Sequence, residues 1–238
     1  MMAGRAFRRR LVDAAAERYW PAGRFAYHFA RGKLAGDPVF CELLARGLVP
    51  DAAHVLDLGC GQGLLASWLM AAEECHRAGE WYEGWPPPPT AWSFRGVELM
   101  SRDVARAREA LAEMGSVEVG DIRTVDFGMA DAVVILDVLH YMGTASQEAV
   151  LGRVRTALSP SGVLLLRIGD AGGGLPFRIS NWVDQAVSFV RGHGLLRLHC
   201  RSLRDWIALL ERLGFRTDAI PTSANTPFAN VLLVARPR

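Results

Sequence analysis

A glycine-rich turn is the feature of this sequence whose residue types and spacing point most directly to chemistry. The string VLDLGCGQG occupies residues 55–63, where a predicted strand runs into a G-x-G-x-G turn and then into a predicted helix. Glycines let the backbone pass close to a ligand, and the free amides at a helix N-terminus favour negatively charged groups. A nucleotide-like ligand is therefore predicted at this turn, because the flanking strand and helix supply the context that a glycine pattern alone lacks.

An acidic residue at the end of the next predicted strand is the second candidate. Dinucleotide-binding proteins have the spacing G-x-G-x-x-G and an acid about 20 residues further on. Here the glycines are more compact, and Glu98 comes later because a Trp- and Pro-rich insertion precedes it. Four acids lie nearer in sequence, but in a predicted helix or in the insertion: Glu73, Glu74, Glu80 and Glu83. Of these acids only Glu98 ends a strand.

The elements that must position these residues alternate between strand and helix patterns, which predicts a parallel sheet with helices on both faces. Strands are expected at 54–58, 94–98, 117–119, 131–138, 163–168, 216–221 and 230–235. Helices are expected at 64–74, at 101–114 with Ser101 as its cap, and at 146–158, followed by a turn at 159–162. A capping box at Ser202 opens a further helix that Gly214 closes, and a turn-rich loop makes the last two strands an antiparallel pair.

The regions outside this alternation define the expected organisation of the chain. Amphipathic patterns predict a helix at 6–19 and another from the N-cap Asp37 and Pro38 to Pro50, so residues 1–50 form a helical cap before an α/β domain at 51–238. The segment 78–93 holds four consecutive prolines and three tryptophans and is expected to be an ordered insertion without regular structure. A second insertion, 169–199, begins with Gly172–Gly174 and is expected to be a hinged lid.

Composition excludes several classes of protein. The 238 residues are 50% hydrophobic, and 27 Lys and Arg against 25 Asp and Glu give a net charge of +2, without the basic footprint of a nucleic-acid-binding protein. No stretch approaches the roughly 20 apolar residues of a membrane span, and Asp13 and Glu17 interrupt any secretory signal. A soluble, cytoplasmic protein is expected, and its oligomeric state is left open.

Cysteine usage does not indicate a metal centre. The chain has four cysteines, Cys41, Cys60, Cys75 and Cys200, and none are paired as C-x-x-C. The doublets Cys75-His76 and His199-Cys200 offer ligand types, but neighbours on one element point in different directions and rarely converge on one ion. No metal site is predicted.

Taken in order, these motifs resemble the class I S-adenosylmethionine-dependent methyltransferase family over about residues 50–238. VLDLGCGQG is similar to the family's first motif and GVELM to its second-strand acidic motif. GDI at 120–122 is similar to the adenine motif, DAVVILDVLHYM to the fourth-strand motif and LSPSGVLLLRI to the fifth-strand entry. The resemblance implies a Rossmann-like, mainly parallel seven-stranded sheet whose last strand pair is antiparallel, with S-adenosylmethionine as the cofactor.

The resemblance also implies roles for individual residues. Gly59, Cys60 and Gly61 would approach the amino-acid portion and ribose of the cofactor, and Asp57 would orient the loop and help to hold the cofactor ammonium. Glu98 suits the two ribose hydroxyls, because a carboxylate accepts two hydrogen bonds at once. The remaining implied contacts are Leu99 and Met100 beside adenine, Asp121 and Ile122 at its amine and ring nitrogen, and Asp137 and Val138 beside the methionine part.

Methyl transfer from a sulfonium requires alignment of the acceptor and exclusion of water, and a catalytic base is optional. His140, directly after the fourth strand, is the candidate base for a hydroxyl acceptor, with a local structural role as the alternative and Tyr141 as the lesser candidate. The Asn-Pro-Pro-Tyr signature of nucleic-acid amino methyltransferases is absent, which favours a small-molecule acceptor. Aromatic residues in the cap and lid favour an apolar or aromatic one, although they could be ordinary core.

The cap string RFAYHFARGKL also resembles small methyltransferases of bacterial aryl-polyene or xanthomonadin-type pigment pathways, which would make the acceptor an aryl hydroxyl or carboxyl. One alternative is a noncatalytic module that keeps the fold for cofactor binding or scaffolding. Another is an NAD-dependent dehydrogenase, which requires the other glycine spacing. A cofactor-binding titration separates these three functions.

Overall fold

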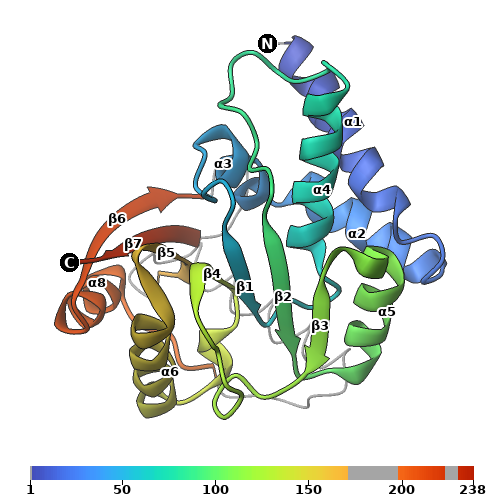
Figure 1. Cartoon of the computed structure of the whole chain (residues 1–238). Coiled ribbons are helices and arrows are strands. Elements are labelled where there is room, and N and C mark those ends of the chain that lie inside the picture. The colour runs from blue at the N-terminus through green and yellow to red at the C-terminus, as the bar shows by residue number, and fades with distance from the viewer. Residues whose placement is uncertain (1, 171–197, 223–229) are drawn as a thin grey trace. The chain divides into compact units, whose positions relative to one another are not determined.

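The structure is a computed structural model that describes residues 2–170, 198–222 and 230–238 (Figure 1). Seven strands form one sheet in the order β3-β2-β1-β4-β5-β7-β6. Their bounds are β1 (His54–Leu58), β2 (Ser93–Glu98), β3 (Ser116–Val119), β4 (Ala130–Leu136), β5 (Leu158–Gly169), β6 (Phe215–Pro221) and β7 (Asn230–Pro237). The chain forms two compact units, Met1–Val133 and Val134–Arg238.

Strand directions confirm the predicted α/β, Rossmann-like sheet. Strand β1 pairs in parallel with β2, and β2 in parallel with β3. Strand β7 pairs antiparallel with both β5 and β6. The buried residues of β1 and β2 are apolar apart from Asp57, as expected for strands covered by helices on both faces.

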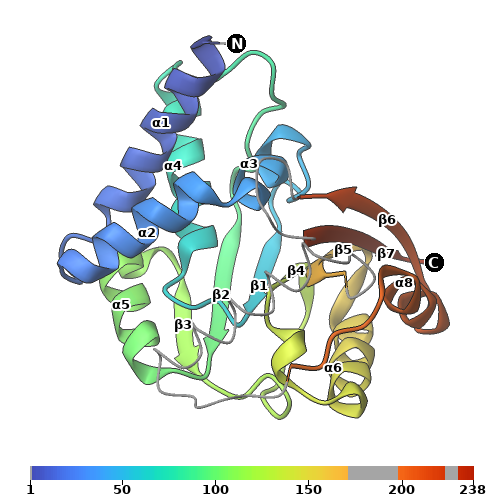
Figure 2. The same cartoon turned by 180° about the vertical axis from the view of Figure 1, so that it is seen from behind.

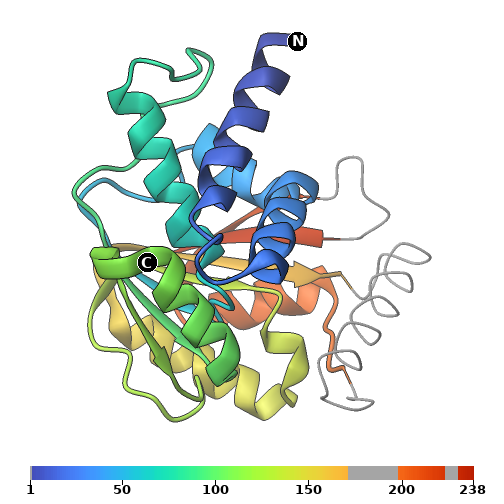
Figure 3. The same cartoon turned by 90° about the vertical axis from the view of Figure 1, so that its right-hand side faces the viewer.

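The first unit surrounds β1–β3 with five helices (Figures 1 and 2). They are α1 (Met2–Glu17), α2 (Arg24–Gly36), α3 (Pro38–Ala45), α4 (Leu64–Arg77) and α5 (Ser101–Leu111), with a short 3-10 turn η1 (Ala112–Met114) after α5. Helix α1 packs against α2 and α4, and Figure 3 shows α1 and α4 side by side. The capping oxygen of Asp37 accepts from the Val39 amide at 3.1 Å, which confirms the predicted start of α3.

One helix of this unit was not predicted, and one predicted helix cap is wrong. No helix was expected at α2, where Gly32 and several aromatic residues weaken the intrinsic propensity. Packing forms it instead, since Ala26, Ala30 and Leu34 recur every four residues and are fully buried. Ser101 is the first residue of α5 and not its cap, and Met100 precedes it without a side-chain cap.

The segment between α4 and β2 has no helix or strand and packs on α1. The Phe7 ring contacts those of Trp81 and Trp85 edge-on, with centroids 5.2 and 5.4 Å away, and stacks with Tyr82 at 6.0 Å. The Trp81 indole nitrogen donates to the Pro86 carbonyl at 3.0 Å. The aromatic rings therefore order this proline-rich stretch without a backbone ladder.

The second unit holds the 3-10 turn η2 (Leu139–Tyr141), α6 (Thr144–Ala157) and α8 (Leu203–Arg212) beside β5–β7. Ser202 caps α8 by accepting from the Asp205 amide at 3.2 Å, and Gly214 takes φ +83° after it, as predicted. Strand β5 is longer than expected, because it includes the predicted turn at 159–162. Proline disfavours helix at the preceding residue and is compatible with extended backbone, so α6 ends before Pro160 and the strand begins at once.

The hinged lid predicted from Gly172–Gly174 lies largely outside the described residues. Within the described ranges, no helix is long and apolar enough to cross a membrane.

Candidate active site

The glycine turn between β1 and α4 has the backbone conformation that its sequence demands. Gly59, Gly61 and Gly63 have φ of +83°, +55° and +74°. A Cβ at Gly63 would lie 2.8 Å from Leu111 Cδ1, so α5 packs where a side chain would be. A Cβ at Gly61 would meet nothing within 4 Å among the described residues. The turn therefore leaves open space beside Gly61, where a ligand can approach the backbone.

Glu98 ends β2, as predicted, and both of its carboxylate oxygens accept backbone hydrogen bonds. Its Oε2 accepts from the Gly61 amide and its Oε1 from the Met100 amide, each at 2.9 Å. The amides of Gly59 and Cys60 in turn donate to the Val97 carbonyl at 2.8 and 3.2 Å. The structure thus brings Glu98 together with the glycine turn, and each oxygen keeps a further lone pair for a ligand hydroxyl.

Asp57, in β1, is an acid without a neutralising partner. Its side chain is buried, and within the described part of the chain its carboxyl has no hydrogen-bond or ion-pair partner. Burial, and then the charge of Glu98, raise the pKa of Asp57 to about 8. The carboxyl is therefore mostly protonated at neutral pH, and a cation placed beside it would favour its ionised form.

Cys60 is buried, and its side chain lies against Gly96 of β2. A Cβ on Gly96 of β2 would lie 2.7 Å from Cys60 Sγ, so the thiol is accommodated by a missing side chain on the neighbouring strand. Burial raises the pKa of Cys60 well above its ordinary value, so it is an un-ionised thiol.

The other predicted residues of the first unit follow β2 and β3. Leu99 is 59% exposed, an unusual position for a large apolar side chain, and Met100 is half-buried. The Asp121 carboxylate is held by Arg123, whose Nε lies 2.9 Å from both carboxylate oxygens, and this contact lowers the pKa of Asp121. Ile122 is buried. Sequence reasoning missed Arg123, although its position two residues after Asp121 was a visible signal.

The predicted residues of the second unit surround the turn after β4. Asp137 has φ +59°, uncommon for a residue with a side chain, and its carboxylate forms an ion pair with Arg167 of β5. The Arg167 side chain is 1% exposed. Val138 is half-buried and directly precedes η2. The missed partner Arg167 could have been found as the one charged residue in the apolar run of β5.

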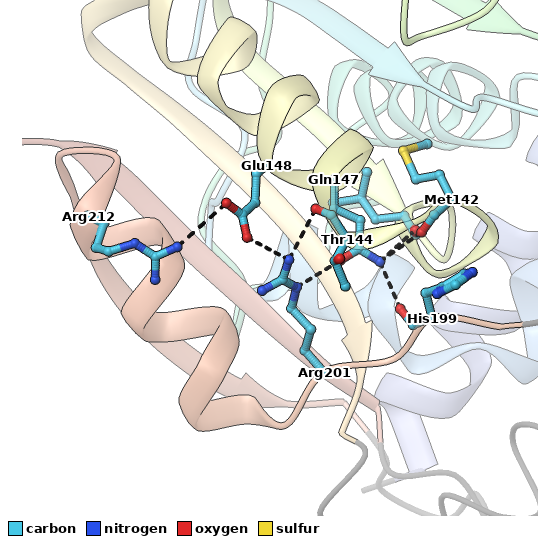
Figure 4. A network of polar contacts seen from close by, with 8 residues as sticks. Met142, Thr144, Gln147, Glu148, His199, Arg201 and Arg212 are labelled. Atoms are coloured by element: carbon cyan, nitrogen blue, oxygen red, sulfur yellow. Dashed lines mark hydrogen bonds and ion pairs between the residues drawn. The ribbon is translucent and has the colours of Figure 1, made fainter.

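His140 lies in η2, half-buried, with its ring centroid 4.2 Å from that of Tyr141. Its backbone carbonyl accepts from the His199 amide at 2.8 Å. Figure 4 shows the polar network around this turn, in which the buried Gln147 side chain donates to the carbonyls of Leu139, Met142 and His199.

Arg201 completes this network. It donates from Nε to the Gln147 side-chain oxygen and from a terminal nitrogen to Glu148, each at 2.8 Å (Figure 4). The turn that carries His140 is therefore fixed by side chains from α6 and by the segment before α8.

Across the described ranges, no group of three or more His, Cys, Asp or Glu residues could hold a metal ion, and none of the four cysteines forms a disulfide. In the first unit, the predicted residues include three kinds: glycines, the buried acid Asp57 with the half-buried Glu98, and the exposed apolar Leu99. Such a set suits an organic, partly cationic ligand.

Comparison with known proteins identifies the family. Residues 28–220, well over half of the chain, match the model of a family described as a methyltransferase domain. The chain belongs to this methyltransferase-domain family. A carboxy-S-adenosyl-L-methionine synthase from Chromohalobacter salexigens is 37% identical to it over 130 residues, which are 52% of this chain and 43% of that protein. The match thus spans less than half of the relative.

Solved structures resemble the methyltransferase domain over most of its length. The mitomycin 7-O-methyltransferase is 22% identical with a TM-score of 0.61, covering 92% of this chain and 60% of that one. The magnesium protoporphyrin IX methyltransferase of Synechocystis, crystallised with S-adenosylhomocysteine (SAH), is 20% identical with a TM-score of 0.57, covering 93% of each chain. At these identities the similarity establishes the Rossmann-like fold.

Proposed function

We propose that this chain is an S-adenosylmethionine-dependent methyltransferase that acts on a small apolar or aromatic molecule bearing a hydroxyl or carboxyl group. The observation that carries the proposal is the pairing of an unneutralised buried acid with a glycine turn tied to a strand-end carboxylate. A family match over residues 28–220 supports the same reaction class.

The residues of the first unit fit the cofactor in charge and in shape. The open space at Gly61 admits a ligand against the backbone, and Asp57 suits the cofactor ammonium because a cation compensates its burial. Glu98 is already oriented by two amides and would accept from the ribose hydroxyls. Gly59 and Cys60 would line the same approach.

Fewer structural observations support the remaining proposed cofactor contacts. The exposed Leu99 and the adjacent Met100 would flank adenine, and the Ile122 amide would meet a ring nitrogen. Asp121 would accept from the adenine amine, although its carboxylate also holds Arg123. For Asp137 and Val138 the support is the sequence motif alone, and the ion pair to Arg167 indicates that the Asp137 carboxylate fixes its own turn.

When bound, the cofactor would supply a methyl group activated on a sulfonium: an electron pair of the acceptor would bond to the methyl carbon, and SAH would leave with the electrons of the broken C–S bond. The chain's own contribution is to hold the acceptor in line and to exclude water. His140 would take the proton from a hydroxyl acceptor, and the Gln147 network would keep its turn in place. A carboxylate acceptor would need no base, and His140 would then only shape the site.

The acceptor class is supported by the aromatic residues of α2 and by the names of fold relatives. Phe25 is 63% exposed and stacks on Phe29, which provides apolar surface on the N-terminal helices. Two solved structures with this fold are a mitomycin 7-O-methyltransferase and a pyocyanin biosynthetic protein. A small-molecule partner and no nucleic acid follow from this proposal. Four cysteines that form no disulfide among the described residues support a reducing, cytoplasmic location.

The test is a methyl-transfer screen with phenolic, carboxylate and amine candidates, read by mass spectrometry. A mass gain of one methyl group on a phenol or carboxylate, with SAH formed, is expected. A carboxylated cofactor, formed in place of a methylated product when a donor of a carboxyl group is supplied, would instead favour the reaction named for the Chromohalobacter relative. Cofactor binding without turnover across the panel would favour the noncatalytic scaffold.

Calorimetry with SAH tests the cofactor assignment separately. Glu98→Ala is expected to weaken binding by about 1.5 to 3 kcal/mol, the usual contribution of hydrogen bonds to a charged group. The control Glu109→Ala removes an exposed acid from the nearby α5 and should leave affinity unchanged. Equal affinity of the parent and the folded Glu98→Ala variant would refute the role of Glu98.

A further inference from the structure

The N-terminal helices contact the glycine turn through a buried hydroxyl. Tyr19, two residues after the end of α1, is fully buried, and its hydroxyl donates to the backbone carbonyl of Gln62 at 2.8 Å. Gln62 lies between Gly61 and Gly63. Burial raises the pKa of Tyr19, so the hydroxyl remains a donor at any physiological pH. Because glycine leaves the backbone free to rotate, a fixed donor at this carbonyl restrains the turn from outside.

The Gln62 side chain extends the contact to α5. It is 2% exposed, and its Nε2 lies 3.4 Å from Oδ1 of Asp103, a buried residue of α5. Its Oε1 is buried and has no donor among the described residues. An apolar side chain of this shape would avoid that unpaired acceptor and would lose only the long contact to Asp103, so stability of the fold alone gives little reason for a glutamine here.

Arg106 connects the same acid to α2. Its guanidinium donates to Asp103 Oδ1 at 3.1 Å and lies 4.7 Å from the centroid of the Phe25 ring. Figures 1 and 2 both show α2 beside α5. A continuous set of contacts therefore runs from α2 through α5 to the glycine turn. We call Tyr19, Phe25, Gln62, Asp103 and Arg106 the cap clasp.

We propose that the cap clasp positions the cofactor loop, with Tyr19 and Gln62 as positioning residues that do not touch the cofactor themselves. This inference rests on the proposed function, because it assumes that the glycine turn binds S-adenosylmethionine. The Gly61 amide donates to Glu98, so fixing the neighbouring Gln62 also fixes the carboxylate assigned to the ribose. The N-terminal helices are then part of cofactor binding.

The test measures SAH affinity by calorimetry in variants that remain folded. Tyr19→Phe removes one hydroxyl without changing the ring and is expected to raise the Kd five- to tenfold. The control Tyr27→Phe makes the same change on α2, where the ring stacks on Trp20 at 4.0 Å, and should leave the Kd unchanged. Unchanged affinity of Tyr19→Phe, with only a lower melting temperature, would show that the contact is purely structural and would overturn the proposal.

A second variant keeps the proposal testable if Tyr19→Phe does not fold. Gln62→Met is nearly isosteric. It removes the buried unpaired oxygen together with the long 3.4 Å contact from Nε2 to Asp103, whose carboxylate keeps Arg106, so the cofactor-free protein should be about as stable as the parent. Its Kd for SAH is nevertheless expected to rise three- to fivefold, and equal affinity would contradict the clasp. Failure of the parent itself to bind SAH would instead refute the proposed function.

Hydrogen exchange provides a readout independent of affinity. In the parent, saturating SAH should slow amide exchange in α2 as well as in the glycine turn, because Arg106 links the two. In Arg106→Lys, which keeps the charge beside Asp103 but loses the planar contact with Phe25, protection should persist in the turn and weaken in α2. Full protection of α2 in this variant would show that Arg106 does not connect them.

Discussion

Asp57 and Asp137 both lie near the end of a strand, but they meet opposite electrostatic environments. In the first unit, Asp57 is buried beside another acid, and its pKa rises to about 8. In the second unit, Asp137 forms an ion pair with the buried guanidinium of Arg167. An acid that is matched by a buried cation serves its own fold, whereas an acid buried without one is suited to a cationic ligand.

The same contrast extends to the surrounding turns. The glycine turn has open space at Gly61 and is held mainly through backbone amides. The turn after β4 is fixed by side chains, above all by the Gln147 side chain, which contacts three carbonyls. The first region therefore leaves room beside its backbone, and the second holds one turn through side-chain contacts.

The largest effect is expected from filling the open space of the first region. Gly61→Val should abolish SAH binding, because the side chain would occupy the ligand's place and valine is strained at a φ of +55°. Gly143→Val offers a matched control, since Gly143 also has no atom within 4 Å of a built Cβ among the described residues but has a negative φ. Calorimetry of both folded variants decides the point, and measurable binding by Gly61→Val would argue against the site.

Replacing each acid with asparagine should change the stability of the cofactor-free protein in opposite directions at pH 8. Asp57→Asn tests the first acid. We expect SAH affinity to fall by about 100-fold, or roughly 3 kcal/mol, through loss of a charged partner. The raised pKa means that the folded parent loses stability as pH rises from about 4 through about 8. Asn does not ionise, so the variant without cofactor should exceed the parent in stability at pH 8 by a few kcal/mol. Urea denaturation of both proteins at pH 5 and pH 8 measures the difference in their free energies of unfolding. An Asp57→Asn variant that is less stable than the parent at pH 8 would contradict this account.

Variants of His140 test whether the turn after β4 takes part in catalysis. If His140 is a general base, His140→Ala should lower the methyl-transfer rate by about 10²-fold with SAH affinity unchanged. The rate of the parent should then rise with pH as the imidazole loses its proton, and the variant should lose that limb. His140→Gln separates the roles, because a residue that only shapes the site would leave that variant most of its activity at all pH values. Full activity of both variants with the parent's pH profile would eliminate the base.

The smallest effect is expected at Asp137. Asp137→Asn leaves the buried Arg167 without its counter-charge and should destabilise the protein by about 2 kcal/mol, measured by urea denaturation. This is the reverse of the change expected for Asp57→Asn at pH 8. A stabilised Asp137→Asn protein would remove the contrast between the two acids.

Local patterns in the sequence were sufficient to predict the sheet and the glycine turn. Strand β2 ends at Glu98 and α4 begins at Leu64 as expected, because apolar periodicity and turn residues act over a few positions. Helix α2 was missed because burial against α1, and not intrinsic propensity, forms it. The sequence likewise could not show that Pro160 lies in a strand.

The partners of the site residues were harder to predict, because they are distant in sequence. Tyr19 and Gln62 are 43 residues apart, and Asp137 and Arg167 are 30 apart. No local pattern joins them, since only the folded chain brings them into contact. The motif therefore identified Asp57 and Asp137 alike as cofactor residues, and the structure alone showed that their environments differ.

Proton release on cofactor binding tests the central claim about Asp57 most directly. Calorimetric titration with SAH at pH 7, repeated in buffers of different ionisation enthalpy, gives the number of protons released per molecule bound. Because the Asp57 carboxyl is mostly protonated before binding and ionised beside the ligand ammonium, the parent should release close to one proton. Asp137→Asn should release the same number, and Asp57→Asn none. Tight binding by the parent without proton release would contradict the assignment of Asp57 to the cofactor ammonium.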